Sequence, residues 1–506
     1  MSERFDVAII GSGVGGSTIA HRLAPTGASI LVLERGERLV REDRNWDPEA
    51  VYAKACYKAT EQWYDAQDRP FRPGQFYYVG GNTKVFGTAM FRFRREDFEE
   101  LAHEGGRSPA WPISYDDLEP YYAEAERLFG VHGEAGRDPT EPGRSGPYPY
   151  APVGHDPGIA EVEKRLQGLG LKPFPLPTSV QHHEGGACIA CDTCDGFPCK
   201  VDGKGDAEVC LLDPALESGN VSLRTGVHVD RLVTDASGRR ILAAEYSSDA
   251  GSGRVEADLF VLSAGAINSA ALLLRSANGT HADGLANSSG MVGRCYMNHN
   301  CSAVMALRPF QRSRVHFQKT LSLNDFYLGD GHDHAYPLGN IQLLGKIKEP
   351  MLRDALWFLP RLGREWLAGH SVDWYVMSED LPDPESRVTV RPDGGIRLSW
   401  RRTNTKAHRR LVARTKKMLR AAGFPIVVSK AFSKETPSHQ CGTVRFGDDP
   451  AASALDPFCK AHDHDNLYVV DAGFFPSSAA VNPALTVAAQ ALRAGEHIAR
   501  AELKAS

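Results

Sequence analysis

The sequence predicts an α/β protein, α+β overall, in which a Rossmann-like nucleotide-binding domain is joined to a second domain built on an antiparallel sheet. The first observation is residues 5–17, FDVAIIGSGVGGS, where an apolar strand runs into a glycine-rich turn. The second is residues 259–275, where LFVLS, a glycine and an Ala/Leu-rich helix repeat that order and return the chain to the same sheet. The third is residues 303–400, where strands such as SRVTVRP and GGIRLSW alternate with polar turns.

Each part of the N-terminal motif has a physical reason. Residues 7–10 are continuously apolar, as in a strand that is buried on both faces of a parallel sheet. Gly11 allows the tight turn, Gly13 lets the backbone approach a pyrophosphate, and Gly16 lets the next helix pack closely on the strand. Glu34 ends the second strand, where it can accept hydrogen bonds from a ribose diol. This segment is compatible with NAD or FAD and disfavours NADP.

Composition bounds the protein without identifying it. The 506 residues suffice for two or more cores, and 42% hydrophobic with 24% charged residues is ordinary for a globular protein. A net charge of -5 gives no reason to expect nucleic acid as a partner. The sequence has no run of eighteen or more apolar residues and begins without a secretory pattern, so we expect a cytoplasmic protein without a membrane span.

The remaining elements are predicted from local patterns. We expect a helix over 49–66 and a glycine-rich, β-prone segment over 76–93. Another helix should begin after Ser114, whose hydroxyl can cap it. Residues 133–158 are rich in Gly, Pro and charge and predict an exposed loop, whereas strands dominate 221–265.

A second glycine pair lies within the β-prone segment. Gly80, Gly81, Asn82 and Thr83, at the end of an expected strand, offer bare backbone that a ring system could approach closely. An ordinary hairpin turn is the alternative interpretation.

The C-terminal region carries further candidates. A buried strand over 466–470 leads to Asp471 and Gly473, and Asn482 then precedes a long helix. Pro483 suits the first turn of that helix, whose free amides would face a group that becomes negatively charged, such as a reduced flavin. A lone histidine is usually a surface or hydrogen-bonded structural residue. His439 is a candidate because it lies in SHQCGT, in the segment that leads back to this strand.

Four cysteines are clustered in CIACDTCDGFPC. Cys188, Cys191, Cys194 and Cys199 are separated by two, two and four residues, a spacing that resembles iron–sulfur or zinc ligation. Free thiols, or one disulfide that staples a crossing between domains, are the alternatives. We assign no metal to the protein, and the four cysteines remain candidate cluster ligands only.

Taken together, these motifs resemble the glucose–methanol–choline (GMC) oxidoreductase family. Within it, the chain is most similar to the pyranose oxidases and the bacterial C-glycoside 3-oxidase-like branch, over nearly its whole length. The motifs that carry the resemblance are GSGVGGS with Glu34, VGGNTKVFGTAMFR, SAGAINSAALLL, SEDLPDPESRVTV, SHQCGT and NLYVVDAGFFPSSAAVNPALTVAAQALR.

The resemblance implies FAD as cofactor, His439 as catalytic base and Asn482 as the partner that orients substrate and flavin. Many relatives have a second histidine at the latter position, and pyranose and cholesterol oxidases have Asn. The implied cofactor-binding residues are Gly11, Ser12, Gly13, Gly16, Glu34, Arg35, Gly80, Gly81, Asn82, Thr83, Val85, Val229, Ala264, Gly265, Asp471, Gly473, Asn482, Pro483 and Thr486. Fungal pyranose oxidases tether FAD through a histidine where this chain has Val85, so the FAD is expected to be non-covalent.

The resemblance also implies a division of the chain. A discontinuous FAD-binding domain would comprise residues 1–50, 76–110, 200–300 and 430–506. A substrate-binding domain with insertions would comprise residues 51–75, 111–199 and 301–429.

The implied reaction is oxidation of a secondary hydroxyl of a sugar or glycoside, at ring position 2 or 3, to a keto-sugar. His439 would take the hydroxyl proton, flavin N5 the hydride, and O2 or a quinone-type acceptor the electrons. The polar stretch 329–342 offers His332, His334, Asn340 and Gln342 as hydroxyl-binding groups. The alternatives are the catalytic subunit of an FAD sugar dehydrogenase with an iron–sulfur cluster in the Cys188–Cys199 loop, or a flavin-bound hydroxynitrile lyase. An oligomer is compatible with the sequence.

Overall fold

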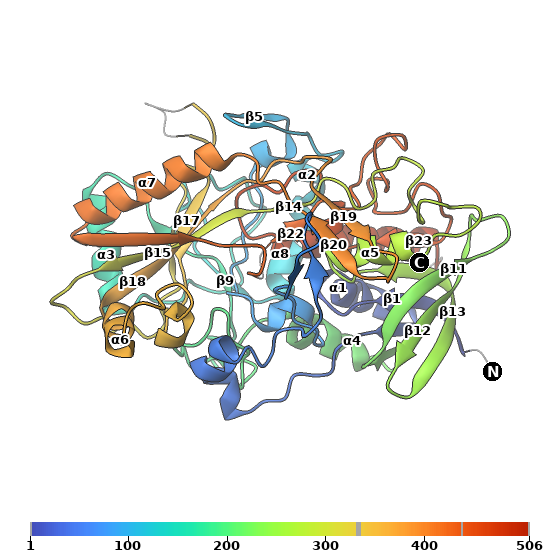
Figure 1. Cartoon of the computed structure of the whole chain (residues 1–506), viewed down its shortest axis with the longest axis horizontal. Coiled ribbons are helices and arrows are strands. Elements are labelled where there is room, and N and C mark those ends of the chain that lie inside the picture. Colours follow the sequence, from blue (N-terminus) through green and yellow to red (C-terminus); the bar gives the residue numbers. More distant parts are fainter. Residues whose placement is uncertain (1–2, 330–334, 437–438, 504–506) are drawn as a thin grey trace.

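The computed structural model describes residues 3–329, 335–436 and 439–503. Figure 1 shows two sheets at opposite ends of the molecule, with the nucleotide-type sheet on the right and an antiparallel sheet on the left. The predicted fold class is confirmed.

The right-hand sheet has a parallel centre. Its strands run in the order β10-β2-β1-β13, and the late strand β23 pairs in parallel with residues 260–262 of β13, on the edge opposite β1. β12 and β11 extend the sheet in antiparallel fashion. The strands are β1 Glu3–Ile10, β2 Ile30–Leu33, β10 Val221–Arg224, β11 His228–Thr234, β12 Ile241–Ser248, β13 Gly251–Leu262 and β23 Leu467–Val469. Because Val7–Ile10 and Ile30–Leu33 are buried, they form the core of this half.

Helices cover this sheet and carry the turns that matter for the site. The helices are α1 Val14–Leu23, α2 Tyr115–Leu128, α4 Asp213–Leu216, α5 Ala266–Arg275 and α8 Ala484–Ala501. α8 packs against both α1 and α2, which joins the two ends of the chain. Ser114 caps α2 as predicted, since its hydroxyl accepts a hydrogen bond from the amide of Asp117 at 3.3 Å.

The left-hand sheet is antiparallel, as predicted for residues 303–400 in general. Its order is β21-β15-β18-β17-β16-β8, and α7 packs on β15, β18 and β21. The strands are β8 Phe174–Pro175, β15 Asn300–Leu307, β16 Leu321–Leu323, β17 Asn340–Leu343, β18 Ser371–Ser378 and β21 Ile426–Ala431. The helices of this half are α3 Pro157–Gly168, α6 Arg361–His370 and α7 Thr405–Ala421. Apolar side chains of α3, α7 and the sheet form its core.

Two strands predicted for this sheet lie elsewhere. SRVTVRP and GGIRLSW contain β19 Arg387–Val390 and β20 Ile396–Ser399, which pair with each other and continue into β3 Trp63–Tyr64 and β4 Pro70–Phe71. β19 packs on α5, on the nucleotide side of the molecule. Alternation of polar and apolar residues identifies a half-buried strand but not the sheet to which it belongs.

Two further local predictions were wrong. Residues 49–66 form only a single helical turn, Glu49–Ala53, because Ala55 adopts a left-handed φ of 47° and the buried Trp63 is needed in β3. Residues 76–93 contain no named strand among the described residues, and a short 3-10 turn, Gly81–Lys84, follows Gly80 instead. The remaining strands form short pairs, β5 Leu101–His103 with β6 Gly106–Ser108, β7 Val131–His132 with β9 Thr178–Ser179, and β14 Met297–Asn298 with β22 Gln440–Cys441.

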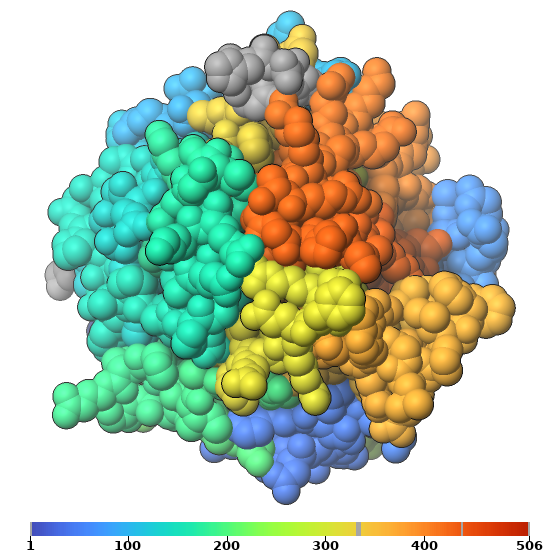
Figure 2. Space-filling model, turned by 90° about the vertical axis from the view of Figure 1, so that its left-hand side faces the viewer, coloured from blue at the N-terminus to red at the C-terminus, as the bar shows by residue number. Residues whose placement is uncertain are grey.

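The left end of the molecule exposes an unusual set of apolar side chains. Figure 2 shows this face, where the loop after β15 and the segment around α6 adjoin. The amide of Ser313 donates to the carbonyl of Gly369 at 2.8 Å and holds the two together. The exposed side chains are Phe310, Trp357, Phe358, Leu362 and Trp366. Within the described ranges, no helix combines the length and the apolar character needed to cross a membrane.

Candidate active site

The two glycine-rich loops are joined through one serine. The hydroxyl of Ser12 donates to Oε2 of Glu34 at 2.6 Å, and it accepts a hydrogen bond from the amide of Gly80 at 3.1 Å. The amide of Ser12 donates to the same carboxylate oxygen at 2.9 Å, and Oε1 accepts from the amide of Gly36 at 2.8 Å. Burial raises the pKa of Glu34. The first loop, the predicted ribose-binding acid and the second loop therefore form one unit.

The first loop is packed tightly everywhere except where a ligand is expected. A Cβ on Gly11, Gly15 or Gly16 would lie 2.4, 1.7 or 2.0 Å from a backbone oxygen. A Cβ on Gly13, the N-cap of α1, would have no described atom within 4 Å, and the same holds for Gly265. Open space at a helix N-terminus, bordered by bare backbone, fits the pyrophosphate of a dinucleotide. The residues present therefore fit the expected cofactor.

Other implied cofactor residues build the walls of this space. Asp471 accepts hydrogen bonds from the amide of Gly265 at 3.0 Å, the hydroxyl of Ser269 at 2.5 Å and the amide of Gly473 at 2.7 Å. It thus ties the turn after β13 to the turn after β23, and burial raises its pKa. Pro483 is the N-cap of α8, one position before the helical turn in which we predicted it.

The remaining implied residues make contacts of their own. Thr486 shares a 2.8 Å hydrogen bond with the hydroxyl of Tyr122, and the guanidinium of Arg35 lies 4.0 Å from the centre of the Tyr77 ring. Thr83 donates to the carbonyl of Gly80 at 2.5 Å. The others are Asn82, which accepts from the amide of Phe76, Ala264, which donates to Ser269, and the buried Val85 and Val229.

The candidate catalytic residues come from separate parts of the chain and meet. Nδ2 of Asn482, the residue before the N-cap of α8, lies 3.3 Å from Nε2 of His439. His439 directly precedes β22, and its neighbour Gln440 is hydrogen-bonded to Gln75, whose amide oxygen in turn accepts from Asn82. The pair is therefore linked to the second glycine loop.

A second histidine, His299, completes the group. Nδ1 of His299 lies 2.9 Å from Nδ1 of His439, and Nε2 of His299 lies 2.8 Å from the carbonyl oxygen of Ser478. Sequence reasoning missed His299. The signal that could have indicated it is MNHN at residues 297–300, where a histidine between two asparagines separates β14 from β15.

Both histidines are held in the neutral form. Burial lowers the pKa of His439 well below its usual value of 6.5. The charge of Lys319 lowers it further, as would a proton on His299. Burial also lowers the pKa of His299, although the carbonyl of Ser478 and the carboxylate of Glu379 oppose this shift. A neutral imidazole can accept a proton, so the electrostatics suit His439 to the role of base.

Two of the four candidate substrate residues reach this site. Nε2 of Gln342 donates to Oδ1 of Asn482 at 2.8 Å and to Oδ1 of Asn340 at 2.9 Å. Asn340 lies one step further away and donates to Ser322 and Asn324. His332 and His334 lie outside the described residues.

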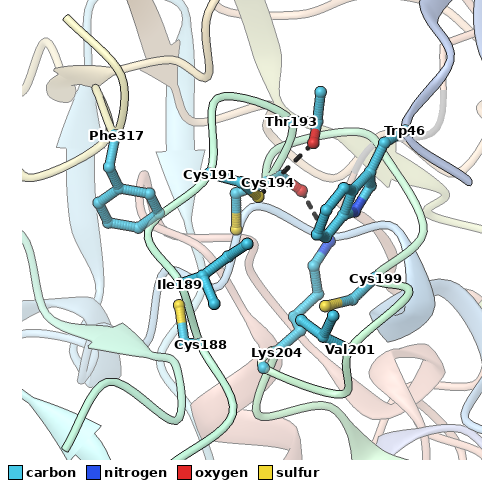
Figure 3. A pocket seen from close by; sticks show the side chains of 11 residues that line it. Trp46, Cys188, Ile189, Cys191, Thr193, Cys194, Cys199, Val201, Lys204 and Phe317 are labelled. Atoms are coloured by element: carbon cyan, nitrogen blue, oxygen red, sulfur yellow. Dashed lines mark hydrogen bonds between the residues drawn. The ribbon is translucent and has the colours of Figure 1, made fainter. Parts of the chain in front are cut away.

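The cysteine loop forms a pocket of its own. Figure 3 shows Cys188, Cys191, Cys194 and Cys199 around one cavity, with Lys204 reaching the carbonyl of Cys194 at 2.7 Å. These four cysteines are unbridged thiols, and burial raises the pKa of Cys194 to about 12. In the described part of the chain, no group of three or more His, Cys, Asp or Glu side chains is placed to hold a metal ion.

Known proteins match both the sequence and the fold. The N-terminal family model described as GMC oxidoreductase matches residues 10–301, and its C-terminal counterpart matches residues 382–491. Paromamine 6'-oxidase of Streptomyces fradiae is 31% identical over 98% of this chain and 91% of its own length. The fructose dehydrogenase large subunit of Gluconobacter japonicus is 28% identical over 97% of each chain.

Solved structures share the fold at lower identity. Pyridoxine 4-oxidase from Mesorbium loti superposes with a TM-score of 0.67 at 20% identity, over 98% of this chain and 99% of that chain. An Aspergillus oryzae RIB40 formate oxidase variant superposes with a TM-score of 0.70 at 16% identity, over 100% of both chains.

Proposed function

Because the chain belongs to the GMC oxidoreductase family and is an FAD-dependent enzyme acting on CH–OH groups, we propose that it oxidises a secondary hydroxyl of a sugar or glycoside. The oxidised carbon is ring position 2 or 3, and the product is a keto-sugar. The observation that carries this proposal is the contact between Asn482 and Nε2 of a neutral His439.

The residues divide the chemistry between them. Nε2 of His439 accepts the hydroxyl proton of the substrate, and the Asn482 amide holds the oxygen from which that proton leaves. Bound FAD supplies the acceptor for the hydride that leaves the same carbon. The glycine loops around Ser12 and Gly80, with Glu34, hold the dinucleotide.

A sugar hydroxyl also has an acceptor in this site. Oε1 of the buried Gln342 has no hydrogen-bond partner among the described residues, whereas its Nε2 is engaged twice. A buried acceptor without a partner is costly, so a hydroxyl donor at this point would be favoured. Gln342 is accordingly the residue that binds a second hydroxyl next to the one being oxidised.

The test is an anaerobic titration of the holoenzyme with monosaccharides, glycosides and aminoglycosides. The flavin absorbance at about 450 nm is monitored during the titration. Bleaching by a sugar, with a product ketone located by NMR at position 2 or 3, supports the proposal. Paromamine 6'-oxidase is named for a 6' position, so a product oxidised at position 6 would contradict the ring position while retaining sugar oxidation. The absence of bleaching by any sugar would contradict sugar oxidation and favour a hydroxynitrile lyase.

The acceptor is tested in the same cuvette. The proposed acceptor is O2 or a quinone-type compound, and rapid return of the absorbance on admission of air would support an oxidase. A flavin that stays reduced in air but is reoxidised by a quinone would support a dehydrogenase. The second candidate is a dehydrogenase with an iron–sulfur cluster in the Cys188–Cys199 loop. The four thiols of this loop line one pocket beside the buried Lys204, but among the described residues they are not placed to hold a metal ion. Thiolate-ligated clusters are anionic, so iron and acid-labile sulfide in the purified protein would support that candidate, and their absence would exclude it.

We also propose that FAD is held without a covalent bond. Val85, at the position where fungal pyranose oxidases carry the tethering histidine, has an aliphatic side chain that cannot form one. Acid precipitation of the protein should leave the yellow colour in the supernatant. Colour that remains in the pellet would contradict the proposal.

A further inference from the structure

We propose that His299 is a positioning residue that fixes the tautomer of His439, so that Nε2 of His439 faces the substrate without a proton. The proposal rests on the function proposed above for His439 and adds a role for a residue outside the predicted site. The tautomer follows from which atom donates and which accepts in the hydrogen bonds that run from Ser478 through His299 to His439.

The series begins at a backbone carbonyl. The oxygen of Ser478 can only accept, so Nε2 of His299, 2.8 Å away, must carry a hydrogen and donate. A neutral imidazole carries one N–H, so Nδ1 of His299 is an acceptor. Nδ1 of His439 lies 2.9 Å from it and must therefore be the donor. With its single hydrogen on Nδ1, His439 has a bare lone pair on Nε2.

The opposite side of His439 agrees with this assignment. Nε2 of Gln342 donates to Oδ1 of Asn482 at 2.8 Å, which turns the amide nitrogen of Asn482 toward His439. That nitrogen can only donate, and Nε2 of His439 lies 3.3 Å from it. Two independent series of hydrogen bonds, one from a carbonyl and one from an amide, thus require the same tautomer.

Burial makes the arrangement specific. His299 is 2% exposed, so water cannot replace its partners, and no donor other than Nδ1 of His439 is recorded for Nδ1 of His299 within the described residues. The charged groups that act on the pair are Glu379, which acts on His299, and Lys319, which acts on His439. When Nε2 of His439 takes the substrate proton, the imidazolium keeps its Nδ1–H bond to His299. His299 therefore supports both protonation states of the base.

The experiment compares His299→Asp with His299→Leu in the holoenzyme. An Asp oxygen stands the same number of bonds from Cα as Nδ1 of His, and an ionised carboxylate can only accept, so it preserves the required tautomer. Leu has a similar size but no acceptor. We expect His299→Leu to lower kcat for flavin reduction about 10- to 100-fold with little change in KM. His299→Asp should keep more activity than His299→Leu and should move the acidic limb of its pH profile to higher pH, because a carboxylate favours the imidazolium.

The reverse order would overturn the proposal, because a residue needed only for packing tolerates Leu better than a buried charge. A second measurement requires neither variant to be active and no substrate. In holoenzyme labelled with 15N-histidine, two-bond couplings should show His439, assigned with His439→Gln, protonated on Nδ1. Protonation on Nε2 would overturn the proposal. An Nδ1–H result in a protein that oxidises no sugar would leave the tautomer assignment in place and contradict the proposed function alone.

Discussion

The side-chain amide of Gln342 donates a 2.8 Å hydrogen bond to Oδ1 of Asn482, a residue 140 positions further along the chain. Gln342 belongs to β17 of the antiparallel sheet, whereas Asn482 precedes α8 on the nucleotide side. This bond therefore connects the two halves of the molecule at the site, and it sets which end of the Asn482 amide faces His439.

Removing this donor should disturb Asn482. In Gln342→Leu the amide of Asn482 can rotate, and a misplaced donor weakens the hold on the reacting oxygen, so we expect kcat to fall about tenfold or more. Stopped-flow flavin reduction with the best sugar measures this. Ser322→Ala, which removes a hydrogen bond two steps away along the same series, is the control and should change kcat less. Equal effects of the two substitutions would argue against a specific role of Gln342.

Replacing the base should separate chemistry from cofactor binding. His439→Asn removes the proton acceptor, and loss of a positioned base costs about 10²- to 10⁴-fold in rate. FAD content should stay at the wild-type level because the dinucleotide loops are formed around Ser12 and Gly80. The ratio of the absorbance at about 450 nm to the protein absorbance measures the FAD content. The rate of flavin bleaching by the sugar measures the rate of substrate oxidation. A variant that keeps wild-type rates would exclude His439 as the base.

The low pKa of His439 predicts the pH dependence of the reaction. The base works only when neutral, and its pKa lies well below 6.5. Activity should therefore be constant from neutral pH downward past 6.5 and should fall only when the pH approaches the lowered pKa. A profile of kcat/KM from pH 4 to 9 measures the pH at which activity falls on the acidic side. A limb above pH 6.5 that disappears in His439→Asn would contradict this prediction.

Ser12 should matter for cofactor affinity. Ser12→Ala removes the hydroxyl that bonds both Glu34 and the amide of Gly80. Hydrogen bonds of this kind are worth about 1 to 2 kcal/mol, so the Kd for FAD should rise about 5- to 30-fold. Titration of the apoenzyme by flavin fluorescence measures the Kd. Thr26→Ala, which removes a local hydroxyl bond at the far end of α1, should leave it unchanged.

His408 should make the protein less stable in acid. Burial lowers its pKa to about 4, and it is hydrogen-bonded between Ser302 and Ser378. The folded state thus disfavours the proton that the unfolded chain binds below pH 6.5, so stability is complete above 6.5 and is lost as the pH falls toward 4. At pH 4.5 this one group should have removed about 2.5 kcal/mol of unfolding free energy.

Urea unfolding at pH 7 and pH 4.5 tests the contribution of His408. The decrease in stability between the two pH values should be smaller in His408→Gln than in the wild-type protein by about that amount. The same decrease in both proteins would assign the acid sensitivity to other groups.

The sequence predicted the parallel core well because the core is encoded locally. Residues 7–10 and 30–33 are continuously apolar, and a strand with that pattern has few alternatives to a doubly covered sheet. Gly11 and Gly16 are required by close backbone approaches that only glycine tolerates, so their spacing also identified the turn. The domain boundaries stay predictions.

The parts that could not be predicted depend on contacts between distant segments. β19 and β20 have the predicted strand pattern, but they join β3, which lies more than 300 residues earlier in the chain. The connection is the pairing of Arg397 in β20 with Tyr64 in β3. The helical pattern of residues 49–66 is overridden by the burial of Trp63 in that same sheet. The short signal MNHN around His299 does not reveal its role, which comes from contacts with Ser478 and His439, 179 and 140 residues away.

The pairing of β23 with β13 has a consequence for how the protein is made. β1 is synthesised some 250 residues before its partner β13, and β23 is added only with residues 467–469. α8, Ala484–Ala501, which packs on α1, is synthesised later still. Non-local parallel pairing forms slowly, so the nascent chain carries an incomplete sheet with open strand edges through most of its synthesis. The dinucleotide-binding loops around Ser12, Gly265 and Asp471 can therefore come together only after residues 467–501 have been synthesised.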